Sequence, residues 1–80
     1  MNTELMVVEI KLRFSNELMK WEDRNVFTSF EVIPGNGGYF VALLGETRIR
    51  LSEAVMGIAK QQGAVESRWN FKGSLQGHYQ

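Results

Sequence analysis

Few residues in this chain of 80 have the types and spacing that catalysis requires. His78 is the only histidine and cysteine is absent, which leaves almost no candidates for nucleophilic catalysis or for a metal site. Glu22 and Asp23 are adjacent, but nothing in the sequence indicates that either is buried, as an acid–base pair of carboxylates would need. We therefore expect no enzymatic activity, no metal and no cofactor.

Two segments could in principle bind phosphate groups. The glycine-rich residues 35–38 lie between two predicted strands, whereas phosphate cradles precede a helix, so they predict a turn. Residues 68–72 (Arg-Trp-Asn-Phe-Lys) interleave cations with aromatic rings, as strands that stack bases do. Because the rings alternate with the cations, we expect the rings on the core side, away from any bound nucleic acid.

Periodicity then indicates the elements that position these residues. Alternating or β-forming residues predict strands over 4–14, 26–33, 39–44, 48–51 and 64–72. Leu44-Gly45-Glu46-Thr47 suits a type II′ hairpin turn. Residues 15–25 favour two structures equally: a short helix near 16–23 capped by Asn16, or an irregular returning strand.

One helix is indicated over residues 52–62. Val55, Ile58, Ala59 and Gln62 share a helical face, Ser52 is a plausible N-cap, and Gly63 suits the position after the last turn. The sequence therefore predicts an α+β fold, with a mainly antiparallel sheet of four to five strands and this helix packed on one face. We expect a single domain over 1–80, with a flexible tail over 73–80.

The charges balance, with nine Lys and Arg against nine Asp and Glu. Zero net charge disfavours a strongly basic nucleic-acid binder and a strongly acidic nucleic-acid mimic, and gives little protection against self-association. The first eleven residues lack the basic start and apolar run of a secretory signal, and no apolar run is long enough to span a bilayer. We expect a cytoplasmic protein, in the host cytoplasm if the source is viral.

The predicted hairpin registers indicate which face of the sheet is the candidate binding surface. If Ile33 pairs with Tyr39 and Leu44 with Thr47, one sheet face seats the helix and the other keeps many apolar side chains. Residues 15–25 could cover that second face through Leu18, Met19 and Trp21, and this alternative stays open. The candidate partner-binding residues on the second face are Phe27, Tyr39, Val41, Leu43, Arg48 and Arg50.

We therefore expect a small non-enzymatic interaction domain that binds a protein partner, binds a second copy of itself as a homodimer, or does both. Size and the absence of motifs suit an accessory or inhibitor protein of a phage or mobile element, which would act by occluding a partner surface. The alternative is a small nucleic-acid-binding regulator with a basic and aromatic sheet face. Its candidate contacts are Lys11, Arg13, Arg68 and Lys72.

Overall fold

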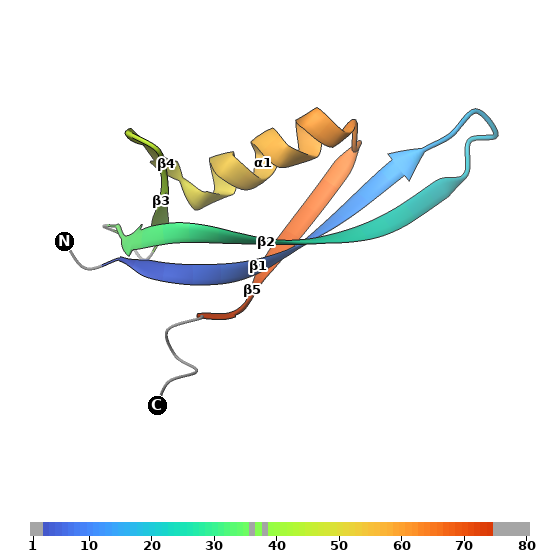
Figure 1. The fold of residues 1–80 in the computed structure, drawn as a ribbon. Helices are drawn as coiled ribbons and strands as arrows, with labels where there is room; N and C mark the ends of the chain where they lie inside the picture. The colour runs from blue at the N-terminus through green and yellow to red at the C-terminus, as the bar shows by residue number, and fades with distance from the viewer. Residues whose placement is uncertain (1–2, 36, 38, 75–80) are drawn as a thin grey trace.

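A computed structural model describes residues 3–35, 37 and 39–74 of the chain. The elements are β1 (Glu4–Ser15), β2 (Trp21–Pro34), β3 (Phe40–Leu44), β4 (Thr47–Arg50), α1 (Leu51–Gln62) and β5 (Glu66–Ser74). The strands form one antiparallel sheet in the order β4-β3-β2-β1-β5, and α1 lies over one side of it (Figure 1). The predicted α+β class is confirmed, with five strands and one helix.

The hydrophobic core lies between α1 and one face of the sheet. The alternation in β1 is confirmed, because Met6, Val8, Ile10 and Leu12 are all buried on this face. At roughly 25 cal/mol per Å² of buried apolar surface, a core of this kind is the main favourable term in folding. It contains Met6, Val8, Ile10, Leu12, Phe30, Val32, Ala42, Leu51, Ala54, Val55 and Ala59.

Helix α1 begins one residue earlier than the sequence predicts. Leu51, expected to end a strand, is instead the first helical residue and is almost fully buried. Arg50 occupies the N-cap position in extended conformation, and no side chain hydrogen-bonds the first turn. The prediction of Ser52 as N-cap is therefore wrong. Because Leu51 is buried as the first helical residue, the helix follows β4 directly, and no linker residue is left to act as a polar cap.

The end of α1 follows the prediction. Gly63 has a φ of 80°, in the left-handed region that favours glycine. Its N–H donates to the Lys60 carbonyl at 3.1 Å, and the Ala64 N–H donates to the Ala59 carbonyl at 3.0 Å. These two bonds form the Schellman arrangement, which satisfies carbonyls that the last turn would otherwise leave without donors.

The two predicted hairpins keep their faces, although one register differs. Leu44 pairs with Thr47 as predicted, and Gly45 has a φ of 63°. Ile33 pairs with Val41 and not with Tyr39, because β2 continues through Pro34 and the loop starts one residue later. The register was therefore wrong by two residues. Because side chains alternate with a period of two, this shift leaves every side chain on its predicted face.

Residues 15–25 form the end of a long hairpin and not a helix. β1 and β2 stay paired up to Ser15 and Trp21, which confirms the returning strand as the correct alternative. The Asn16 carboxamide oxygen closes the turn by accepting hydrogen bonds from the backbone N–H groups of Leu18 and Lys20, at 3.0 and 3.2 Å. Figure 1 shows this hairpin extending beyond α1 and the rest of the sheet.

The hairpin consequently does not cover the second sheet face. Leu18 and Met19 are 74% and 84% exposed, and Trp21 is also exposed. The alternative in which these three side chains shield the face is therefore wrong, because strand pairing carries them away from the body of the sheet.

The sheet curls, which brings aromatic rings of distant strands together. Phe40 of β3 and Phe71 of β5 have two strands between them, a separation of about 14 Å in a flat sheet. Their ring centres are nevertheless 5.1 Å apart. Trp69 packs against the core as expected, whereas Val65 precedes β5 and is exposed. Gly73 and Ser74 belong to β5, and the remainder of the expected tail lies outside the described residues.

Candidate protein-interaction surface

The side of the sheet opposite α1, here called the open face, has no described element lying over it. Side chains alternate along each strand, so the register assigns the residues of this face directly. Its members on β1 and β2 are Leu5, Val7, Glu9, Lys11, Arg13, Asp23, Asn25, Phe27, Ser29, Glu31 and Ile33. Its members on the other strands are Val41, Leu43, Arg48, Arg50, Glu66, Arg68 and Asn70.

At one end of the open face, five apolar side chains surround the exposed Glu31. Leu43 and Leu5 lie on either side of Glu31, from β3 and β1 respectively, and Val41 lies opposite Ile33. Val7 follows on β1, where it lies opposite Ser29. All but Leu5, which is more exposed, are half-buried. We call Leu5, Val7, Ile33, Val41 and Leu43 the apolar patch.

Two arginines of edge strand β4 flank the apolar patch. Arg48 lies opposite Leu43, and Arg50 lies opposite Val41. Four of the six predicted partner-binding residues therefore form one block of neighbouring side chains. Aromatic residues and arginine are the types that most often dominate binding energy at protein interfaces, usually beside well-packed apolar groups.

Of the other two predicted residues, Tyr39 contacts Arg50 at the edge of this block, and Phe27 lies outside the block. Tyr39 precedes β3 and packs its ring against the turn, where a Cβ added at Gly35 would approach the ring to 2.9 Å. Its ring also lies beneath Arg50, whose Cζ is 4.4 Å from the ring centre. Phe27 is 59% exposed and lies diagonally across from Val7 at the edge of the apolar patch, about 20 Å along β2 from Ile33.

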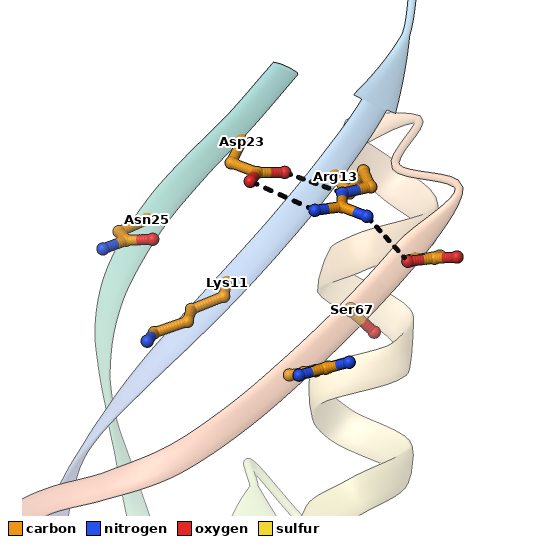
Figure 2. A pocket seen from close by; sticks show the side chains of 7 residues that line it. Lys11, Arg13, Asp23, Asn25 and Ser67 are labelled. Atoms are coloured by element: carbon orange, nitrogen blue, oxygen red, sulfur yellow. Dashed lines mark hydrogen bonds and ion pairs between the residues drawn. The ribbon is translucent and has the colours of Figure 1, made fainter. Parts of the chain in front are cut away.

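The opposite end of the open face is polar and holds a depression of about 340 Å³. Arg13 donates from Nε to Asp23 Oδ1 at 2.9 Å and from Nη2 to Asp23 Oδ2 at 3.4 Å, and its Nη1 lies 3.8 Å from Glu66 Oε2. Figure 2 shows the guanidinium held between the carboxylates of β2 and β5. The hydrogen bond and charge of Arg13 lower the pKa of Asp23, and the same contacts raise the pKa of Arg13.

The four cations proposed for nucleic-acid contact do line up on β1 and β5. Lys11 lies directly opposite Arg68, but Arg13 is engaged by two carboxylates and Lys72 Nζ lies 3.9 Å from Glu9 Oε1. Within the part of the chain that the structure describes, Lys11 and Arg68 alone of the four have no carboxylate within ion-pair distance. The set is therefore half neutralised by the protein's own acids.

Sequence reasoning missed part of this surface. Glu9 is only 8% exposed although it lies on the open face, and it accepts a hydrogen bond from Asn25 Nδ2 at 3.1 Å. Leu5 and Val7 alternate with the buried residues of β1, but only the β1–β2 register shows that they extend the patch of β3. The alternation of β1 could not reveal which residues of β2 lie beside it.

No metal centre or membrane span emerges from residues 3–35, 37 and 39–74. These residues contain no group of three or more acidic, histidine or cysteine side chains that could hold an ion, and no helix among them is long and apolar enough to cross a bilayer. His78 lies outside the described residues. A scan of family models, a search of curated proteins and a search of solved structures each found no match to the chain.

Proposed function

We propose that the chain is a non-enzymatic protein-interaction domain that binds a protein partner through the apolar patch of the open face. The observation that supports this is the grouping of five apolar side chains on three neighbouring strands with no described element above them. Exposed apolar side chains gathered on one face of a small domain often mark an interaction site, and here they surround Glu31. Covering a partner surface in this way would suffice for the accessory or inhibitory role in a cytoplasm that we infer from the sequence.

The arginines beside the patch indicate the chemistry of the partner. A guanidinium presents a fixed fork of donors that matches a carboxylate, so Arg48 and Arg50 favour a partner with acidic groups around an apolar centre. We also propose that a second copy of the chain can occupy the same face. The net charge of zero gives little repulsion between copies. A dimer formed in this way would compete with binding of another partner.

Nucleic-acid binding receives less support from the geometry. Affinity for a phosphate backbone grows with the number of cations that can neutralise phosphates. Arg13 and Lys72 already face carboxylates of this chain, so binding phosphate would first require breaking those contacts. Lys11 and Arg68, which lie opposite each other, are the two candidate cations through which nucleic-acid binding can be tested.

A comparison of three immobilised baits tests the protein-binding proposal. The bait Leu5→Lys plus Leu43→Lys places two ammonium groups in the patch, both beside Glu31, so the free domain keeps a nearby counter-charge. The control Met56→Lys adds one lysine at an exposed position of α1. We expect the unaltered chain and the control to retain a partner that the double variant does not retain. Measured with the purified partner, the affinity of the double variant should be lower by at least about a hundredfold. Equal retention by all three baits would refute the proposal.

A further inference from the structure

A second candidate site is a pocket of about 280 Å³ beside the start of α1. Four aromatic residues line it, from β3, from β5 and from the loop before β3, together with three residues around the helix start. They are Tyr39, Phe40, Trp69, Phe71, Arg50, Leu51 and Ser52. Only Tyr39 and Arg50 also belong to the predicted partner-binding set, and most of the pocket faces the α1 side of the sheet.

The aromatic rings hold each other in place while keeping part of their surface exposed. Phe71 meets Phe40 edge to face with ring centres 5.1 Å apart, and it meets Trp69 in the same manner at 5.3 Å. Tyr39 and Phe71 nevertheless remain 40% and 39% exposed. The pocket is therefore preformed and apolar, and its volume suits one large side chain better than a drug-sized ligand.

Arg50 gives the pocket a single positive charge. Its guanidinium stacks 4.4 Å from the centre of the Tyr39 ring, and no carboxylate of the described residues lies within ion-pair distance of it. Arg24 makes a contrast, because it stacks on Phe14 at 4.5 Å and also lies 3.6 Å from Glu22. The donors of Arg50 consequently remain available to an anion bound beside the rings.

We propose that this pocket receives an aromatic or large aliphatic side chain of the protein partner, next to a carboxylate that Arg50 binds. This inference rests on the proposed function and specifies the partner as a segment with an apolar side chain beside an acidic group. One guanidinium among apolar walls matches the single charge of a carboxylate. A nucleotide phosphate would call for further cations, and no other Lys or Arg lines the pocket.

The test follows Trp69 fluorescence in a Trp21→Phe background, which leaves Trp69 as the only tryptophan. The probes are N-acetyl-phenylalanine, which carries the carboxylate, and N-acetyl-phenylalaninamide, which lacks it. We expect a saturable change with the acid at a Kd on the order of 1 mM, and binding of the amide about fivefold weaker or more. Arg50→Gln should abolish the preference for the acid, and the matched control Arg24→Gln should retain it.

Three results would overturn the proposal: no saturable change with either probe, equal affinity for acid and amide, or tighter binding of AMP than of N-acetyl-phenylalanine. The variants alter exposed side chains, and circular dichroism confirms that they fold. If neither probe binds but capture of the partner still depends on Leu5 and Leu43, only the pocket proposal is refuted. If the probes distinguish acid from amide but capture does not depend on these two residues, only the proposed function of the apolar patch is refuted.

Discussion

Leu43 of β3 and Arg48 of β4 lie directly opposite each other on the sheet face that α1 leaves open. Directly opposite residues in an antiparallel pair are close neighbours, so an apolar side chain and a guanidinium share one small area of surface. Val41 and Arg50 repeat the arrangement one step along the same two strands. This doubled pairing of apolar and basic groups is the geometric basis for expecting an acidic, partly apolar protein partner.

A glycine within α1 and the glycine directly after it predict opposite changes in stability. A Cβ added at Gly57 would meet no atom within 4 Å, so Gly57→Ala should stabilise the domain by about 0.5–1 kcal/mol through helix propensity. Gly63 has equally open surroundings but a φ of 80°, so Gly63→Ala should destabilise it by about 1–2 kcal/mol. Urea denaturation of the two variants measures both changes. A loss of stability in Gly57→Ala would show that the helix approaches another element there.

The Arg13–Asp23 pair predicts a pH-dependent contribution to stability. Because the pKa of Asp23 is lowered in the folded chain, the pair stabilises the fold above the unfolded pKa of about 3.9, and this stabilisation is lost as pH falls through the lowered value. Asp23→Asn should therefore be less stable than the unaltered chain near neutral pH, and the two stabilities should converge in acid. Denaturation curves at a series of pH values test this. A difference that stays constant into acid would contradict it.

Lys11 and Arg68 predict that removing one cation stabilises the sheet. Like charges directly opposite on neighbouring strands repel, so Arg68→Gln should raise the free energy of unfolding by a few tenths of a kcal/mol, roughly 0.2–1. The gain should vanish at about 1 M salt, where the Debye length falls to about 3 Å. Lys72→Gln is the control, since it removes a cation that faces Glu9 and should give no gain. Destabilisation by Arg68→Gln at low salt would show that this cation has a favourable partner.

The same cations set the salt dependence expected of any nucleic-acid binding. Two available cations on a single-stranded oligonucleotide should give a slope of about −1.4 for log affinity against log salt, at about −0.7 per contact. All four candidates acting together would double it to about −2.8. A fluorescence-anisotropy titration over several salt concentrations measures the slope. A value near the steeper limit would favour the nucleic-acid alternative over the protein-binding proposal.

The sequence predicts the sheet, the helix and both faces, because these depend on local alternation. Met6 and Ile10 are buried on the helix side as the period of two requires, and Gly63 ends the helix as its conformational freedom allows. The block that contains Val41 and Arg48 could be predicted from the sequence, because a hairpin with a tight turn allows few strand registers.

The remaining features depend on contacts between segments distant in the sequence. Leu5 joins the patch because β1 pairs with β2 in a register that neither strand encodes alone. The aromatic pocket forms because the curvature of the sheet brings Phe40 and Phe71 into contact. The residue pattern of either strand alone does not predict this curvature. The neutralisation of Arg13 by Asp23 and Glu66 likewise depends on three strands meeting in one register.

Sedimentation velocity of the purified chain over a wide range of concentrations tests most directly whether the apolar patch is an interface. We predict concentration-dependent dimerisation of the unaltered chain and of Met56→Lys, and a monomer at every concentration for Leu5→Lys plus Leu43→Lys, with circular dichroism showing that all three fold. A double variant that dimerises as strongly as the unaltered chain, or an unaltered chain that stays monomeric throughout, would contradict this account of the open face.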